Sequence, residues 1–464
     1  MRHLVSQLAV LDSPEIESIH DASLRILART GIKVPHAATL RICAEFGAEV
    51  DHRTCIVRIP APVMERTLAR LRAAAELPVS DNRACPLEGW ISTQVYVADY
   101  PSNTRRLGVL DDVKKGITLV QRLRNLPYAN AVVIPSDVPP LLTDVVSFQL
   151  IYSYSQKPGG TFVLTPSSAR HILNMADVMG RSIRFLLDTV SPLQFQEKSL
   201  EIATLFAQAR QPIGISAMVM AGGSGPVTLA GTLALENAET LACAFLVHAL
   251  TSGAPRYTAI PHSLDLRTML CSFGSPNQAL LAVAVAQLAR RYGLVPECNA
   301  GLTDSLRPDF QAGFEKGFTG AIAALAGARA IGAQGLAGAD QGFSFEQLVL
   351  DNEWLDTYNY VVQGIAAGAE ELAEEVIASV GIGGSYLGED HTAHHARQAY
   401  LHSKIFNRYG WDAWQKRGAK DSLVKAAEFV EMATTGYDRM DPVCTPAEYE
   451  SLNRIAQDAE RESN

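Results

Sequence analysis

Residues 299–316, NAGLTDSLRPDFQAGFEK, concentrate polar chemistry between an apolar run and an alanine-rich stretch. The polar members are Asp304, Arg307, Asp309, Gln311 and Glu315. Clustered carboxylates can move protons or stabilise a cation. They can equally serve the fold, because an aspartate that precedes a helix caps its free amide groups and an arginine can pair with it. The position of this stretch in the fold must decide between the two interpretations.

Three other features carry the residue types of a functional site. The GGSGP turn at residues 222–226 precedes a helical stretch, but Thr228 replaces the third glycine of a dinucleotide-binding pattern, which favours a plain tight turn. His391 and His395 have the spacing of two metal ligands on a helix, yet the H-E-x-x-H pattern is absent and packing or surface roles are commoner. Cys298 is expected to be a buried structural cysteine. We therefore predict no metal site.

Composition excludes several classes of protein. The 40 Lys and Arg against 49 Asp and Glu give a net charge of −9, without any basic block, so nucleic acid is not an expected partner. The apolar stretch 241–250 is too short to span a bilayer, and the first residues lack the apolar core of a signal peptide. Seven scattered cysteines without a C-x-x-C pair argue against disulfides and thiolate zinc. We expect a globular, cytoplasmic protein that does not bind membranes.

The two ends of the chain differ from its middle. Residues 1–88 predict a small α+β cap, with a first helix that begins at Ser13 as N-cap and Pro14, and with a hairpin formed by AEVD and CIVRI. Residues 364–464 predict a helical extension in which HTAHHARQAYLHSKIFNRYG resembles one helix and TPAE a capping box. We accordingly divide the chain into a cap (1–88), a middle domain (89–363) and an extension (364–464).

The middle domain alternates short apolar runs with helical stretches. Eight runs stand out: QVYVA, AVVIP, GTFVLT, RFLLDTV, IGISAM, RYTAI, LVPECN and AQGLAG. Strands that alternate with helices form a parallel sheet covered on both faces, and eight units over this length predict an α/β fold of the (β/α)8 barrel type. A doubly wound open sheet is the structural alternative.

A barrel carries its active site where the strands end and the following loops begin. Residues 299–316 are then the loop after the seventh strand, which explains their polar content. The loops after the other strands add the remaining candidates, among them Asp99, Tyr100, His262 and residues 339–345.

Several long segments together resemble the trimethylamine methyltransferase family. They are SIHDASLRILARTGIKV, GPVTLAGTLALENAETLA, DSLRPDFQAGFEK, FSFEQLVLDNE, HTAHHAR and GAKD. The resemblance covers nearly the whole chain and implies a (β/α)8 barrel that moves a methyl group from an amine to cobalamin on a separate corrinoid protein. This chain lacks a D-x-H-x-x-G cobalamin motif, so the cofactor is expected to arrive on that partner.

The resemblance also implies a substrate class. Members that act on trimethylamine use pyrrolysine, expected in or beside the segment that matches residues 299–302, where this chain has ordinary residues. The chain resembles the non-pyrrolysine branch, which demethylates glycine betaine and similar quaternary amines. A quaternary ammonium releases a neutral tertiary amine, so it needs binding and alignment rather than covalent activation.

We therefore predict a quaternary amine methyltransferase and assign its site. Asp304 and Glu315 are the predicted catalytic residues. The predicted substrate-binding residues are Tyr96, Asp99, Tyr100, His262, Asn299, Gln311, Gln341, Phe343 and Phe345, in which the aromatic rings would face the cation and the His, Asn and Gln side chains a carboxylate. The alternatives are a metal-dependent barrel lyase or hydrolase built on His391 and His395, and a non-catalytic quaternary-amine-binding protein. A homo-oligomer is expected.

Overall fold

The computed structural model describes residues 6–75, 86–100, 102–160, 162–332, 334–397 and 399–463. Its N-terminal part contains α1 (Ser13–Arg29), β1 (Ile32–Lys33), α2 (Ala37–Glu45), β2 (Glu49–Asp51), β3 (Ile56–Arg58) and α3 (Ala61–Ala74). The three strands form an antiparallel sheet in the order β1-β3-β2, which confirms the predicted hairpin. Asp12, not Ser13, is the N-cap of α1: Asp12 and Glu15 exchange hydrogen bonds between side chain and backbone, both at 2.8 Å.

The middle of the chain contains eight strands that are each followed by a helix. The strands are β4 (Glu88–Trp90), β7 (Ala129–Asn130), β8 (Gly159–Gly160), β9 (Phe185–Asp188), β10 (Ile213–Ser216), β12 (Tyr257–Ala259), β15 (Pro296–Cys298) and β16 (Ala330–Gly332). The helices are α4 (Leu110–Val120), α5 (Thr143–Tyr154), α6 (Pro166–Met179), α7 (Glu197–Gln208), α8 (Leu229–Thr251), α9 (Pro276–Tyr292), α10 (Phe310–Leu325) and α11 (Phe345–Val361). The predicted α/β class is confirmed.

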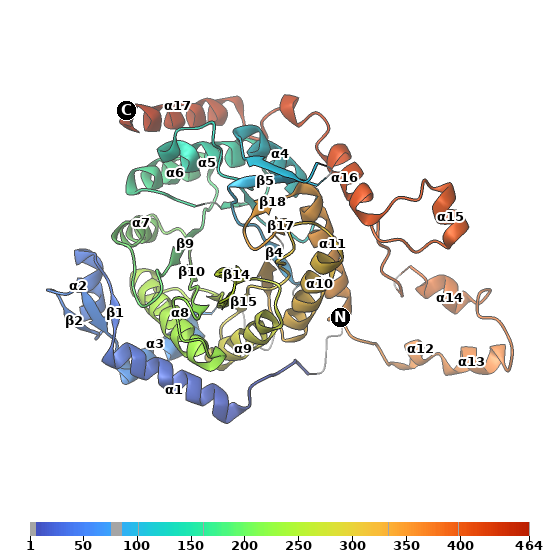
Figure 1. The fold of residues 1–464 in the computed structure, drawn as a ribbon, viewed down its shortest axis with the longest axis horizontal. Coiled ribbons are helices and arrows are strands. Elements are labelled where there is room, and N and C mark those ends of the chain that lie inside the picture. Colours follow the sequence, from blue (N-terminus) through green and yellow to red (C-terminus); the bar gives the residue numbers. More distant parts are fainter. Residues whose placement is uncertain are drawn as a thin grey trace.

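The eight strands lie inside a ring of the eight helices (Figure 1). Every ladder between them is parallel: β7 pairs with β8, β9 with β10, and β12-β15-β16-β4 form one sheet in which the last strand pairs with the first. β10 and β12 share no ladder in the described structure, but just beyond both strands the Ile260 amide donates to the Ala217 carbonyl and the His262 amide to the Val219 carbonyl, each at 3.0 Å. The described residues of β8 and β9 share no ladder.

The first, second and eighth strands lie earlier in the chain than predicted: the second, β7, ends at Asn130, directly before AVVIP. QVYVA belongs to β5 (Tyr96–Asp99) and AQGLAG to β17 (Leu336–Ala337), and both are members of a separate sheet, β17-β18-β5-β6, with β18 (Gly342–Phe343) and β6 (Thr104–Leu107). The apolar runs are genuine strands, but the parallel ring uses the shorter strands β4 and β16 just before them. Sequence pattern alone does not distinguish two successive short strands that belong to different sheets.

Two further short strand pairs extend the loops of the ring. β11 (Met220–Ala221) pairs in parallel with β13 (His262–Asp265), which forms an antiparallel hairpin with β14 (Leu270–Ser272). By length and composition, α8 is the one helix in the described part of the chain that is apolar enough to cross a membrane, but 83% of the window concerned is buried inside the protein. α8 is therefore a core helix of the fold.

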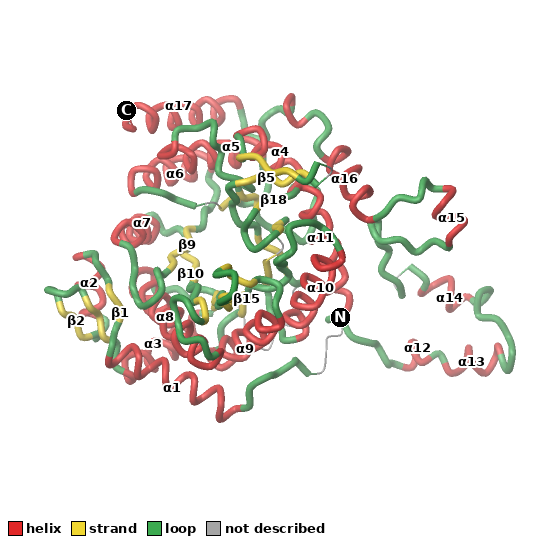
Figure 2. The backbone as a smooth tube through the Cα atoms, viewed as in Figure 1, coloured by secondary structure: helices red, strands yellow, loops and turns green. Residues whose placement is uncertain are grey.

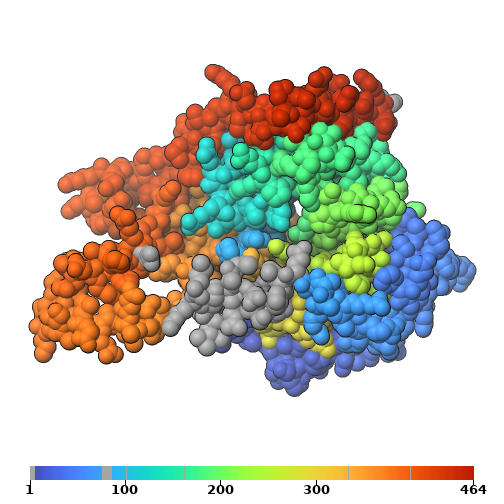
Figure 3. All heavy atoms as spheres, turned by 180° about the vertical axis from the view of Figure 1, so that it is seen from behind, coloured from blue at the N-terminus to red at the C-terminus, as the bar shows by residue number. Residues whose placement is uncertain are grey.

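The C-terminal part is helical only in places. Residues 364–421 contain the short helices α12 (Ala369–Leu372), α13 (Glu374–Val380), α14 (Asp390–His395) and α15 (Trp411–Lys416), none of which has a buried residue. Most of this segment is loop (Figure 2), and part of it stands away from the rest of the molecule (Figure 3). The predicted single helix over HTAHHARQAYLHSKIFNRYG is wrong: α14 covers only Asp390–His395, and Ile405 is the one buried residue among the described residues of this stretch, too little for a packed helix face.

The chain then returns to the body of the protein. α16 (Ser422–Ala433) and α17 (Pro446–Ser463) follow, and α17 lies along α5 and α6 (Figure 1). The predicted TPAE capping box is confirmed, since the Glu448 carboxylate accepts the Thr445 N–H at 2.7 Å and the Thr445 hydroxyl accepts the Glu448 N–H at 3.3 Å.

Candidate active site

A cavity of about 700 Å³ occupies the centre of the strand ring, and each of the eight parallel strands contributes to its wall. Side chains alternate between the two faces of a strand, so every second residue points inward. In β9 the alternation is visible in the burial: Phe185 and Leu187 are buried, whereas Leu186 is 46% exposed and Asp188 is open to the cavity. The ring thus encloses space rather than a fully packed core.

The wall of the cavity near the amino ends of the strands is an ion-pair cluster. Arg256 donates to Glu88 at 3.1 Å and to Glu297 at 2.9 Å, and Arg184 lies 3.5 Å from Glu297. Burial opposes ionisation of Glu297, but the two arginines outweigh it and hold its pKa below the ordinary value. Arg329, buried behind the wall, also lies 3.6 Å from Glu88, so every acid of this cluster is paired with an arginine.

Aromatic side chains line the same cavity along three consecutive strands. Trp90 ends β4, Tyr128 precedes β7 and Phe162 follows β8, and all three are partly exposed. The face of an aromatic ring carries negative charge and attracts cations, and Trp is the strongest of the three in this respect. The cavity therefore has a wall suited to a cation without N–H donors.

Asp188, at the end of the next strand, is the carboxylate in this cavity without a partner. No other described residue donates a hydrogen bond to its side chain or forms an ion pair with it. Its location deep in the molecule raises the pKa of its carboxyl group by desolvation. An unpaired carboxylate in such a place is a candidate partner for a positively charged ligand.

Asn299, directly after β15, is part of the cavity wall and has a buried, unpaired side-chain oxygen. Its Nδ2 lies 2.8 Å from His262 Nε2, and His262 Nδ1 lies 2.9 Å from Gln278 Oε1. Burial lowers the pKa of His262 to about 4, so the ring is neutral, donates from Nδ1 and accepts at Nε2. This chain of bonds fixes the amide of Asn299, which is 6% exposed and whose Oδ1 has no partner in the described structure.

Two carboxylates of α8 hold the strand ends around the cavity. Glu236 accepts the backbone N–H groups of Val219 at 2.7 Å and Ile260 at 2.8 Å. Glu239 accepts from Thr189 Oγ1 and Ser191 Oγ, both at 2.6 Å, and from the Leu193 N–H at 2.8 Å. Glu236 and Glu239 of the LENAETLA segment thus have a positioning role on the loops after β9, β10 and β12.

Among the residues predicted from the sequence, Asn299 alone is part of the cavity wall, and His262 contacts it. Asp304 accepts from Ser272 Oγ at 2.7 Å and from the Phe273 N–H at 2.6 Å, which ties the 299–309 loop to the end of β14. Glu315 accepts from Thr303 Oγ1 at 2.6 Å, the Asp304 N–H at 2.8 Å and Gln311 at 2.8 Å. Asp304, Gln311 and Glu315 therefore organise this loop.

The other predicted residues lie in or next to the separate β17-β18-β5-β6 sheet, because the first and eighth strands of the ring come earlier in the chain than the apolar runs indicate. They are Tyr96, Asp99, Tyr100, Gln341, Phe343 and Phe345. Phe343 and Phe345 pack edge to face at 5.0 Å in the core, and Arg105 stacks on Tyr96 at 4.2 Å and donates to Gln341 at 3.0 Å. None of these six residues is part of the cavity wall.

Sequence reasoning missed Trp90, Tyr128, Phe162 and Asp188. Asp188 carried a usable signal, since it is an ionisable residue inside the apolar run RFLLDTV. Trp90 carried none, because it ends a three-residue strand at the predicted boundary of the cap. The spacing of Tyr128 and Phe162 gives no indication that they face one cavity.

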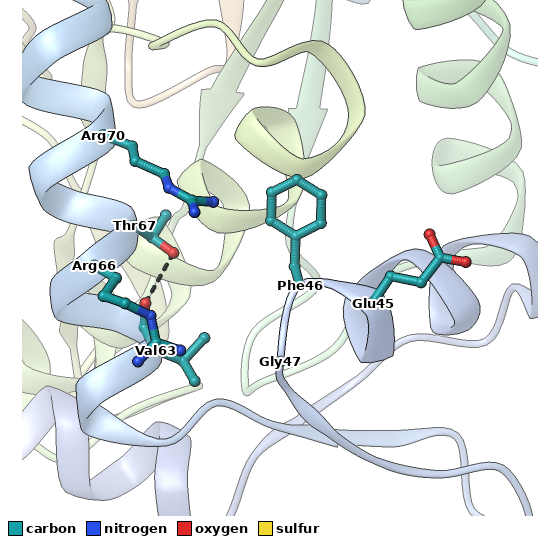
Figure 4. A pocket seen from close by; sticks show the side chains of 7 residues that line it. All are labelled: Glu45, Phe46, Gly47, Val63, Arg66, Thr67 and Arg70. Carbon is teal, nitrogen blue, oxygen red and sulfur yellow. Dashed lines mark hydrogen bonds between the residues drawn. The ribbon is translucent and has the colours of Figure 1, made fainter.

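Two other places gather residues of functional types. A notch of about 270 Å³ between α2 and α3 is lined by Arg66, Arg70 and Phe46 (Figure 4), at the carboxyl end of α2, where a helix dipole favours positive charge. His391 and His395 lie with ring centres 4.4 Å apart on α14, and the described residues contain no group of three or more potential metal ligands. The metal-dependent alternative thus gains no support from the described residues.

The sequence matches the trimethylamine methyltransferase (MTTB) family over residues 1–461. The trimethylamine methyltransferase MttB of Desulfitobacterium hafniense is 30% identical over 443 residues, which cover 91% of this chain and 88% of the relative. The glycine betaine methyltransferase of Desulfitobacterium hafniense strain Y51 is 26% identical and covers 90% of both chains. The solved monomethylamine methyltransferase MtmB of Methanosarcina barkeri has a similar fold, with a TM-score of 0.54 at 10% identity over 94% of this chain and 90% of that one.

Proposed function

The chain belongs to the trimethylamine methyltransferase family, and on that premise we propose that it transfers a methyl group from a quaternary amine to cob(I)alamin. The proposed substrate is glycine betaine or a related betaine, and the proposed acceptor is carried by a separate corrinoid protein. The similarity to a glycine betaine methyltransferase supports this substrate class. We further propose that the ring of strands is a (β/α)8 barrel, with the cap and extension at residues 1–88 and 364–464.

The observation that carries the proposal is the unpaired Asp188 in a cavity walled by Trp90, Tyr128 and Phe162. A quaternary ammonium has no N–H group, so hydrogen-bond acceptors alone cannot select it. Aromatic faces and one carboxylate attract its diffuse charge, at about 0.5–2 kcal/mol for each ring. An ammonium ion with N–H groups loses more favourable hydration in a cavity of this kind than a quaternary ammonium does, so the cavity favours the methylated cation.

The proposed reaction needs no covalent help from the chain. The methyl carbon moves to cobalt(I) of the partner's corrinoid, the carbon–nitrogen bond breaks, and its electron pair remains on nitrogen, so a neutral tertiary amine leaves without a proton. The chain has only ordinary residues at positions 299–302, where no adduct-forming side chain is present. Its own side chains bind the cation, orient one methyl group and exclude water, and alignment of this kind lowers the barrier.

The corrinoid partner is proposed to approach the carboxyl ends of the strands. Loops at that end expose large apolar side chains around residues predicted to be functional: Met269 is 65% exposed, Leu306 66% and Phe310 90%. Apolar side chains gathered on one face are characteristic of protein–protein contact. Asp304 and Glu315 would contribute by holding the loop that carries Leu306 and Phe310.

A direct test mixes the purified chain with free cob(I)alamin and a panel of amines, and follows the conversion of cobalt(I) to methylcobalt(III) by absorbance. We expect transfer from at least one betaine and essentially none from trimethylamine. Trimethylamine is a poor donor here because it would have to expel an amide-like anion unless its nitrogen were first protonated or covalently engaged.

Two outcomes would contradict the proposal. Turnover of trimethylamine equal to that of the best quaternary amine would refute the chemical argument. Normal binding of betaines without any methyl transfer, also with a corrinoid protein present, would favour the non-catalytic binding protein.

A cytoplasmic location and a homo-oligomer remain predictions from the sequence.

A further inference from the structure

The charged groups on the cavity wall are not all paired with one another. Six charged residues are part of the described wall: Glu88, Arg184, Asp188, Lys198, Arg256 and Glu297. Glu88, Arg184, Arg256 and Glu297 pair with one another within 3.5 Å. One acid, Asp188, and one base, Lys198, are left over.

Lys198 reaches the cavity from outside the strand ring. It is the second residue of α7, and its neighbours Gln196 and Ser199 and, one turn on, Ile202 are also part of the wall. α7 packs against β9 and β10, and its first turn contributes to the cavity wall. The α7 side of the cavity thus carries polar groups, Gln196, Lys198 and Ser199.

The ammonium group of Lys198 has no partner in the described structure. It is exposed, and no described residue accepts a hydrogen bond from it or forms an ion pair with it, Asp188 included. Glu197, the adjacent acid, is exposed and is not part of the cavity wall. A free cation beside a cavity that already has a separate free anion suits a ligand with both charges.

We propose that Lys198 is the specificity residue that binds the carboxylate of a zwitterionic substrate while Asp188 and the aromatic rings bind its ammonium group. The proposal rests on the proposed function and deepens it. Lys198 does not touch the methyl group, so its role is to select betaines over quaternary amines that lack an anionic group. Gln196 and Ser199 lie beside it and can donate further hydrogen bonds to the same carboxylate.

The size of the cavity agrees with a ligand that spans two charged positions. Glycine betaine has eight non-hydrogen atoms, which need at most about 240 Å³ if each occupies the roughly 30 Å³ of a liquid water. The cavity measures about 700 Å³. There is room for betaines with a longer spacer between nitrogen and carboxylate.

The test measures binding by calorimetry for trimethylammonio carboxylates with spacers of one to four methylene groups. Tetramethylammonium and choline serve as ligands without a carboxylate. The variants are Lys198→Gln and Lys198→Arg, with Lys416→Gln on the exposed helix α15 as a matched control. Because Lys198 is exposed and unpaired, the melting temperatures of the variants should equal that of the parent.

For at least one betaine, Lys198→Gln should weaken binding about 10- to 100-fold, the range of a lost charge-assisted hydrogen bond. Binding of tetramethylammonium and choline should not change, Lys198→Arg should retain most of the affinity for the betaine, and Lys416→Gln should have no effect. Equal losses for ligands with and without a carboxylate, or no loss for any betaine, would overturn the role of Lys198. A different result would contradict the proposed function: none of the quaternary amines would serve the parent chain as a methyl donor to cob(I)alamin.

Discussion

The replacement Asp188→Asn tests the binding of the cation most directly. Asp188 is the unpaired acid of the cavity wall, and asparagine keeps its size while removing its charge. The methyl groups of a quaternary ammonium hold a carboxylate about 5 Å from the nitrogen, where two unit charges attract by about 3 kcal/mol at an effective dielectric constant near 20. We expect the Kd of the best betaine to rise by roughly 30- to 150-fold, the lower value allowing for the dipole of the amide.

The loss should appear in binding rather than in the chemical step. The positive charge on nitrogen disappears as the carbon–nitrogen bond breaks, so Asp188 stabilises the bound substrate at least as much as the transition state. An interaction of this kind changes KM and leaves kcat unchanged or slightly higher. Stopped-flow measurement of methyl transfer over a range of betaine concentrations separates the two constants.

The stability of the same variant should depend on pH differently from that of the parent. Desolvation raises the pKa of Asp188 in the folded protein, so the folded state holds this proton more tightly than the unfolded state does. Ionisation of Asp188 therefore lowers the free energy of unfolding as the pH rises from the unfolded pKa through the folded one. At neutral pH, Asp188→Asn should raise the melting temperature, although it weakens binding.

Binding should show the opposite dependence on pH. The parent should lose affinity for betaine as the pH falls through the raised pKa of Asp188, and this loss should be absent in Asp188→Asn. Asp177→Asn, on the exposed side of α6, is the control for removal of an aspartate charge. An unchanged Kd with a large fall in kcat would refute the assignment and give Asp188 a chemical role instead.

Three further predictions concern the wall, the loop and the fold. Trp90→Ala should weaken binding of every quaternary ammonium by about 0.5–2 kcal/mol, measured by calorimetry, whereas an unchanged affinity would remove Trp90 from the cation site. Asp304→Ala should lower the free energy of unfolding by about 1–3 kcal/mol in urea, because the hydrogen bonds to Ser272 and Phe273 are lost. It should also slow methyl transfer by more than the loss of folded protein explains. Activity equal to that of the parent would leave Asp304 a purely structural role. Asp351→Asn should destabilise the fold by about 3–5 kcal/mol, because Lys316 Nζ lies 3.0 Å from Asp351 and both are fully buried; a change under about 1 kcal/mol would show that Lys316 is neutral in the fold.

The alternation of apolar runs and helical stretches by itself determined the α/β class. Five of the eight predicted strands overlap a parallel strand of the ring, and AVVIP and AQGLAG begin directly after one, since buried strands have an apolar signal in the sequence. The capping box at Thr445 and the hairpin of β2 and β3 were equally readable, because each depends on residues a few positions apart. The long segments that resemble the methyltransferase family indicated the class of chemistry, whereas the composition only excluded other classes of protein.

Only the tertiary structure decided which side chains face the cavity. The ring uses β4 and β16, which lie slightly earlier in the chain than the predicted strands. Six predicted site residues therefore lie in or next to another sheet, and Trp90 of β4 is part of the cavity wall instead. Whether Asp188 and Lys198 are unpaired depends on the pairing of Arg184 and Arg256 with Glu297, residues that are far apart in the sequence. The local sequence pattern predicts where strands lie, but which charges in the cavity are paired depends on residues from all the strands of the ring.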